Sequence, residues 1–301
     1  MINLEPVSYN GWENCYRLSN DEIELIFPTE IGIRILHFGF IGGDNVFASV
    51  EADRGKTGGD DFRLYGGHRF WIAPEHSYLT YEPDNAPVNV QPFDTFVRLT
   101  QPVGSRSHMQ KEVDIYLIPR KNRISIVHRL VNHGTDAVER GLWALSVMAP
   151  GGMGILPLPP RGTHPEDLLP TSTLTLWSYT DLIDPRWTFG ERFIRLQQDP
   201  ASTKPQKIGA SVPDGWAAYQ LGDTVFLKAF RPHTGSNYPD KNCSVELFTN
   251  NEMLELETLS RLYTLQPGQI YEHVEHWSLY RDIPALKTDE DIAKHVESQV
   301  D

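Results

Sequence analysis

Short segments of alternating apolar and polar residues, separated by turn signals, run through most of the chain from Tyr16 onward. This period of two is typical of β-strands, and the 3.6-residue period of helices is scarce. The pattern predicts an all-β fold of antiparallel sheets packed face to face, each with one apolar face inward. Strands are expected at residues 22–27, 33–40, 113–118, 123–131, 138–148, 173–178, 216–221, 224–230, 243–249, 253–259 and 270–280.

Two segments depart from this pattern. Residues 150–170 carry six prolines, and because proline cannot donate to a central β-ladder, an ordered loop is expected there. The sequence TDEDIAKHVESQV predicts a C-terminal helix capped by Thr288, with acidic residues in its first turn. We therefore expect one sandwich domain over residues 1–286 and a peripheral helical tail over residues 287–301.

The strand MLELETLS, residues 253–260, places two leucines on one face and Glu255 and Glu257 on the other. Two such carboxylates stand roughly 7 Å apart. If both are desolvated, at least one pKa rises, which suits a general acid or base near neutral pH. The alternative is that both glutamates face water or pair with an arginine. In a large twisted sheet, such polar positions would line a concave trough able to hold a ligand.

The segment YGGHRFWIAPEH, residues 65–76, concentrates side chains of the kinds that bind sugars. Aromatic rings suit the C–H face of a sugar, and charged groups suit its hydroxyls. The candidates are Tyr65, His68, Arg69, Trp71, Glu75 and His76. A metal held by His68, Glu75 and His76 would follow no recognised spacing, so no metal is expected. The alternative is a structural arginine under a turn, with a buried tryptophan.

Further candidates lie in residues 222–248, where Lys228 falls within a predicted strand and Asp240 in a polar loop. Lys228 is expected either as a surface charge or as a group that projects into the trough. The chain has no nucleophile elbow, no Walker loop, no GxGxxG after a strand and no HExxH motif. No cofactor is expected.

Composition narrows the classes of partner. Forty acidic and 27 basic residues give a formal charge of −13, which disfavours nucleic acid and anionic membranes and suits a neutral small molecule. The start of the chain has no signal-peptide pattern and no long apolar run follows, so a soluble, cytoplasmic protein is expected. Cys15 and Cys243 have no CxxC partner and are expected as reduced core thiols.

The motifs LELETLS and LQPGQIYEHVEHWSLY resemble the C-terminal part of the galactose mutarotase-like superfamily, which includes aldose 1-epimerases. The segment EIELIFPTEIGIRILHFGFIGGDNVF is similar to the opening hairpin of that family. GGHRFWIAPE, YPD, ELETLS and EHWSLY together resemble an uncharacterised bacterial branch of it. The resemblance covers nearly the whole chain and implies a β-supersandwich. It also implies that Glu257 is the general base, that Pro267 and Gly268 form the following turn, and that Arg69 binds the sugar.

The chain departs from this family at one catalytic position. Mutarotases carry their general acid histidine after the mid-chain hairpin, whereas here the segment reads LWALSVMAPGG, with Trp143 or Ser146 in that region. A proton donor would have to come from elsewhere. We expect His68, or His276 if its strand borders the trough, to take this role.

The sequence thus predicts a carbohydrate-binding protein, with anomeric epimerisation as the leading reaction. Glu257 and His68 are the expected catalytic residues. The expected substrate-binding residues are Arg69, Trp71, Glu75, Trp143, Lys228, Asp240, Glu255 and His276. Two alternatives stay open: a recognition module that binds sugar without turnover, and a lyase or other sugar-modifying enzyme on the same fold.

Overall fold

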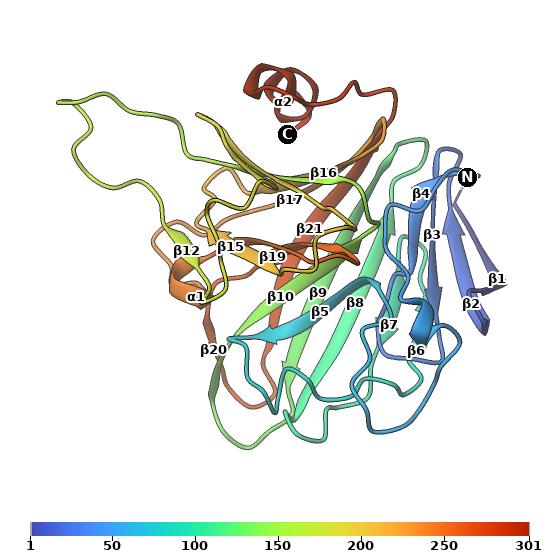
Figure 1. Cartoon of the computed structure of the whole chain (residues 1–301). Helices are drawn as coiled ribbons and strands as arrows, with labels where there is room; N and C mark the ends of the chain where they lie inside the picture. Colours follow the sequence, from blue (N-terminus) through green and yellow to red (C-terminus); the bar gives the residue numbers. More distant parts are fainter. Residues whose placement is uncertain (1, 301) are drawn as a thin grey trace.

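The computed structural model describes residues 2–300, which form three antiparallel sheets (Figure 1). The first sheet has the order β1-β2-β3-β4, with strands Asn3–Tyr9, Trp12–Ser19, Ile23–Pro28 and His37–Phe40. The second, seven-stranded sheet has the order β12-β15-β18-β19-β10-β20, with β5 also paired to β10. Its strands are β5 (Gly67–Ala73), β10 (Val138–Met148), β12 (Leu174–Leu176), β15 (Gln206–Ala210), β18 (Val245–Thr249), β19 (Leu254–Leu259) and β20 (Tyr263–Leu265).

The third sheet has ten strands in the order β13-β14-β11-β16-β17-β21-β9-β8-β7-β6. In chain order these are β6 (Asn89–Pro92), β7 (Val97–Thr100), β8 (Met109–Leu117), β9 (Arg123–Asn132), β11 (Met153–Pro157), β13 (Trp187–Phe189), β14 (Phe193–Gln197), β16 (Trp216–Leu221), β17 (Thr224–Phe230) and β21 (Ile270–Tyr280). The all-β prediction is confirmed.

The main core lies between the seven-stranded and ten-stranded sheets. Leu254 and Leu256 of β19 belong to the same buried apolar cluster as Phe226 of β17 and Trp277 of β21. Because side chains alternate along β19, the glutamates between and after these leucines point to the other face of their sheet. The apolar half of the MLELETLS pattern therefore fixes which way its carboxylates face.

Helical structure is limited to short segments. They are α1 (Pro239–Asn242), α2 (Asp289–His295) and the 3-10 turns Glu51–Asp53 and Glu297–Gln299. In α2 the Thr288 side chain accepts a hydrogen bond from the Asp291 backbone, which completes the expected cap. Ile292 is fully buried in one cluster with Phe193 and Trp216, so α2 packs over the end of the ten-stranded sheet (Figure 1).

The proline-rich stretch differs from the sequence prediction at its start. Residues 153–157 form β11, which pairs with both β14 and β16 inside the ten-stranded sheet. This is possible because the only proline in β11, Pro157, is its last residue. The rest of the stretch, up to Pro170, is a loop. Among residues 2–300, no helix is long and apolar enough to cross a membrane.

Candidate functional site

Strand register brings the candidate residues into one row across the seven-stranded sheet. On its outer face, the direct Cα partners run from Arg69 through Leu145, Glu257 and Glu246 to Gly209. The row crosses β5, β10, β19, β18 and β15, which come from four separate parts of the sequence, since β18 and β19 are consecutive strands. Pairing between strands of one sheet, more than sequence proximity, therefore assembles this site. We call Arg69, Lys207, Glu246, Glu255 and Glu257 the glutamate site.

Glu257 is fully buried in the centre of this row. Its Oε2 accepts a hydrogen bond of 2.6 Å from Trp143 Nε1 and another of 3.0 Å from Lys207 Nζ. Within residues 2–300, its Oε1 has no hydrogen-bond partner. A buried carboxylate oxygen without a donor is costly, and a bound ligand would relieve that cost by supplying a hydroxyl.

Lys207 is the counter-ion of the site. Its Nζ lies 2.7 Å from Glu246 Oε2, and the rings of Trp143 and Trp177 each stand 4.8 Å from it. Burial alone would lower the pKa of Lys207, but Glu257 and Glu246 raise it on balance well above its ordinary value. The amine is therefore a fixed positive charge between two carboxylates.

Glu246 and Glu255 stand close to Glu257, and one lysine cannot balance the negative charge of three carboxylates. Burial raises the pKa of Glu246 well above its usual range, and the charge of Glu257 adds to this effect. Burial and Glu257 together raise the pKa of Glu255 to about 7. Glu255 is only half-buried, so it offers a carboxyl that can hold or release a proton near neutral pH.

Arg69 lies at the β5 end of the row and has 1% of its surface exposed. Its guanidinium stacks 3.9 Å from the Trp71 ring and 5.0 Å from the Phe62 ring. Two of its nitrogen atoms, Nε and Nη2, have no hydrogen-bond partner among the described residues. Burial lowers the pKa of Arg69 to about 9. Two buried, unpaired donors next to an aromatic plane are suited to a polar ligand.

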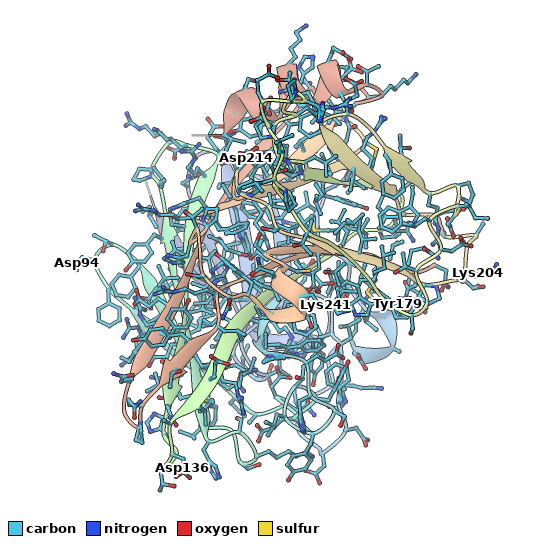
Figure 2. The ribbon with its side chains drawn as sticks, turned by 90° about the vertical axis from the view of Figure 1, so that its left-hand side faces the viewer. Asp94, Asp136, Tyr179, Lys204, Asp214 and Lys241 are labelled. Carbon is cyan, nitrogen blue, oxygen red and sulfur yellow. The ribbon has the colours of Figure 1, made fainter. Side chains whose placement is uncertain are left out.

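Side chains from surface loops border the glutamate site. The Tyr81 hydroxyl donates a hydrogen bond to Glu75 Oε1, and the carboxyl of Glu75 is exposed. Burial raises the pKa of Tyr179 to about 12, although the charge of Lys207 has the opposing effect. Asp240 is half-buried, and burial raises its pKa while Lys207 lowers it. Figure 2 labels Tyr179 and Lys241, which mark the loop of Tyr179 and the short helix α1 that contains Asp240.

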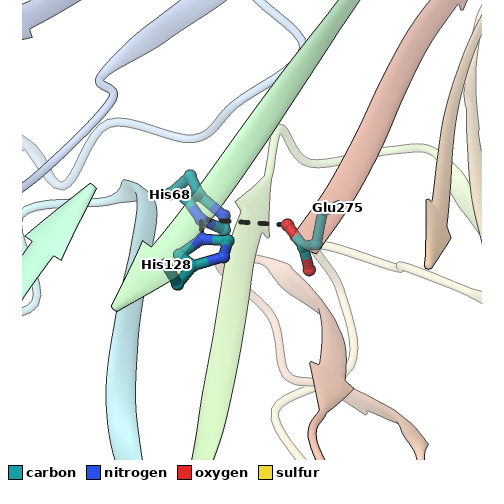
Figure 3. Close-up of side chains that lie close together, drawn as sticks. All are labelled: His68, His128 and Glu275. Carbon is teal, nitrogen blue, oxygen red and sulfur yellow. Dashed lines mark hydrogen bonds and ion pairs between the residues drawn. The ribbon is translucent and has the colours of Figure 1, made fainter. Parts of the chain in front are cut away.

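The expectation that His68 stands opposite Glu257 is wrong. His68 and Arg69 are consecutive in β5, so their side chains leave opposite faces of the strand, and His68 points into the space between the sheets. Its Nε2 lies 2.8 Å from His128 Nε2 and its Nδ1 lies 2.9 Å from Ser146 Oγ (Figure 3). Burial holds its pKa well below the usual range, so it is a neutral imidazole.

Lys228 is neither a surface charge nor a trough residue, because it belongs to the same buried group of side chains as His68. Its Nζ lies 3.1 Å from Glu275 Oε1 and donates to the backbone oxygens of Ala144 and Leu256. Trp277 Nε1 donates to Glu275 Oε2 over 2.8 Å. We call His68, His128, Lys228, His273 and Glu275 the interlayer cluster; all are buried.

Three residues of the interlayer cluster lie close enough together to hold a metal ion. The Nε2 atoms of His68 and His128 and a carboxylate oxygen of Glu275 lie within 4.8 Å of one another (Figure 3). Their hydrogen bonds are nevertheless complete: the His128 Nδ1–H donates to His273 O over 3.1 Å, which leaves His128 Nε2 to accept from His68. The grouping of His68 with Glu75 and His76 does not form in the described part of the chain, where His68 is buried between the sheets and Glu75 and His76 are exposed after β5.

His276 does not border the glutamate site. It lies exposed on the outer face of the ten-stranded sheet, where its Nδ1 is 2.8 Å from Ser125 Oγ. Of the ten residues expected at the site, the seven-stranded sheet and its loops gather Glu257, Glu255, Arg69, Trp71, Trp143, Glu75 and Asp240. His68, Lys228 and His276 lie elsewhere.

Sequence reasoning missed Lys207 and Glu246. Each is a charged residue inside a short apolar strand, QKIGA and VELFT, which is the signal that could have found them. Gly209, the direct partner of Glu246 at the end of the row, leaves the necessary space, because a Cβ there would stand 2.5 Å from Cys243 Sγ and 3.2 Å from Glu246 Cγ.

No protein-family model and no curated protein sequence matches the chain. Solved structures do match it. A galactose mutarotase-like protein from Lactobacillus casei has a TM-score of 0.53 and 12% identity, covering 89% of this chain and 100% of its own. A proposed aldose 1-epimerase from Escherichia coli K12 gives 0.51 and 12%, covering 89% and 99%.

A third match is the GH36 α-galactosidase AgaB from Geobacillus stearothermophilus, with a TM-score of 0.51 and 9% identity over 93% of this chain. The chain spans 41% of that enzyme's length. Together these structures show that the chain has a galactose mutarotase-like sandwich fold, as its motifs indicate. The fold is one that carbohydrate-active proteins use.

Proposed function

We propose that the protein binds a carbohydrate at the glutamate site and interconverts its anomers, with Glu257 as the general base. The observation that carries this proposal is the row on the outer face of the seven-stranded sheet. There, among the described residues, Oε1 of the buried Glu257 and Nε and Nη2 of Arg69 have no hydrogen-bond partner, and the Arg69 guanidinium lies on the Trp71 ring. A sugar offers both the hydroxyls and the apolar C–H face that these groups lack.

Anomerisation needs a base and an acid at the same carbon. Glu257 would take the proton of the anomeric hydroxyl while an acid protonates the ring oxygen, so the C1–O5 bond breaks and a C1 carbonyl forms. Rotation about C1–C2 and reversal of both proton transfers close the other anomer. Lys207 and the Trp143 N–H orient the Glu257 carboxyl group through direct hydrogen bonds to its Oε2.

Glu255 is our candidate for the acid, since neither Trp143 nor the buried His68 can act as an imidazolium there. It shares a face with Glu257 two residues away, it is partly accessible, and its pKa of about 7 leaves it half-protonated at neutral pH. Arg69, Trp71, Glu75 and Asp240 would then bind the sugar from around it.

Exchange between sugar anomers, measured by NMR, tests the catalytic proposal. Glu257→Gln keeps the shape of the side chain but removes its basicity, and the exchange rate should fall to the uncatalysed value. Glu252→Gln is the matched control, because Glu252 is exposed in the turn before the same strand. Equal rates for wild type and Glu257→Gln would remove the enzymatic claim.

A recognition module without turnover is the second candidate. It is favoured by Trp143, which occupies the region where the resemblance implies the acid histidine, and by the Lys207 ion pair that occupies one oxygen of Glu257. Thermal stabilisation by a library of free and phosphorylated sugars, without anomer exchange, would support it. A lyase would instead release an unsaturated product that absorbs in the ultraviolet. If no sugar shifts the melting curve, carbohydrate binding itself fails.

A further inference from the structure

A cavity of about 290 Å³ lies beside the end of β19 and along β21. Its walls include Arg231, His233, Ser260, His273 and His276, which bring several N–H and O–H donors together. Glu272 also lines it, but Arg129 Nε neutralises that carboxylate at 2.6 Å. We call this cavity the arginine pocket.

Arg231, which lines the pocket, and Arg261, which is next in sequence to a lining residue, have no carboxylate partner among the described residues. Within residues 2–300, neither Arg231 nor Arg261 forms an ion pair, although the chain has 40 acidic and 27 basic residues. Arg261 is not itself a lining residue but directly follows Ser260, which is one. Its guanidinium lies 5.7 Å from the Tyr263 ring, and its buried Nε lacks any hydrogen-bond partner in the described part of the chain. Burial is the largest cause that lowers the pKa of His233, and the positive charges of Arg261 and Arg231 lower it further.

We propose that the arginine pocket binds a phosphate group. Guanidinium groups match the oxygens of phosphate with paired hydrogen bonds, and neutral imidazoles such as His233 can donate one more. The volume corresponds to several water molecules at about 30 Å³ each, which is enough for a phosphate and its hydration. An anion here would supply the partner that Arg231 and Arg261 lack.

The pocket adjoins the glutamate site. Leu259 lines the pocket and also packs with Trp143, and it lies two residues after Glu257 on the same face of β19, about 7 Å along the strand. The phosphate could therefore be free or belong to a phosphorylated sugar. Only this second source rests on the proposed function.

Isothermal titration with inorganic phosphate at low ionic strength tests the pocket. We expect Arg231→Gln and Arg261→Gln each to weaken binding at least about 10-fold, because each removes a charged donor. Arg120→Gln is the control, because it removes the same charge from a side chain that is 86% exposed and does not line the pocket. Arg231 is also exposed, so its replacement leaves the core intact if Arg261→Gln does not fold.

Absence of phosphate binding by the wild type, or equal affinity in Arg231→Gln and Arg120→Gln, would overturn the proposal. Glucose and glucose 6-phosphate distinguish the sources. Tighter binding of the phosphorylated sugar than of either phosphate or glucose, with loss in Arg231→Gln, assigns a sugar phosphate; no gain over phosphate assigns the free ion. If phosphate binds but glucose does not, and glucose 6-phosphate binds no more tightly than phosphate, the result would count against the carbohydrate site. The proposal for the arginine pocket would still stand.

Discussion

Replacing Lys228 by methionine would leave Glu275 as a buried charge without its cation. Both side chains have no exposed surface, and Lys228 Nζ lies 3.1 Å from Glu275 Oε1. Methionine preserves the apolar stem that packs between the sheets. The Trp277 and Thr258 side chains would still donate hydrogen bonds to the carboxylate, so the loss is chiefly electrostatic.

The expected loss of folding free energy is about 3 to 5 kcal/mol at neutral pH, which is typical when one partner of a buried ion pair is removed. Burial alone would raise the pKa of Glu275, but Lys228 and three neighbouring imidazoles hold it well below its usual range. The wild type therefore draws stability from Glu275 above the ordinary glutamate pKa and loses it at lower pH. Without Lys228 the folded-state pKa rises, so the difference between the proteins should shrink as the pH falls toward 4.

Urea denaturation followed by tryptophan fluorescence, at pH 7.5 and pH 5, measures both effects. The double variant Lys228→Met, Glu275→Gln removes the stranded charge and should recover a large part of the lost stability, even if Lys228→Met alone folds poorly. A loss below about 1 kcal/mol at pH 7.5 would refute the reasoning. So would a double variant that is no more stable than Lys228→Met.

Three further outcomes are expected. Anomer exchange should slow as the pH rises through about 7, because Glu255 must be protonated to donate, and Glu255→Gln should remove that dependence; an unchanged pH profile would exclude Glu255 as the acid. Trp143→Phe should lower the exchange rate about 10-fold or more by removing the 2.6 Å hydrogen bond to Glu257 while leaving an aromatic ring, and an unaltered rate would contradict this role. Thr288→Ala should destabilise the protein by about 1 kcal/mol in thermal unfolding, since it deletes the cap that Asp291 completes; no change in Tm would mean that α2 does not contribute to global stability.

Local patterning located about half of the strands, since the expected segments overlap eleven of the twenty-one strands within residues 2–300. Residues 138–148, 216–221, 224–230 and 270–280 form strands with the bounds that alternation and turn residues predict. In MLELETLS it also separated the core leucines from the outward glutamates. Strand bounds and the alternation of side chains depend on neighbouring residues, so they can be predicted from the sequence.

The errors arose where long-range pairing decides the outcome. Glu246 and Glu257 are direct partners on adjacent strands, and Lys207 reaches both from a third strand, a relation that no local pattern encodes. His68 is a different case. Strand alternation already places it opposite to Arg69, but grouping residues by proximity in the sequence obscured that information.

The position of β21 has a consequence for how the chain is made. This strand lies between β17 and β9, so it joins two halves of the ten-stranded sheet that are complete by residues 230 and 132. During synthesis on the ribosome, both halves must wait with an unpaired edge until residues 270–280 have emerged. Such edges can pair with other chains, and contacts this distant in sequence form slowly. Nascent protein arrested before residue 270 should therefore bind chaperones that the finished chain no longer needs.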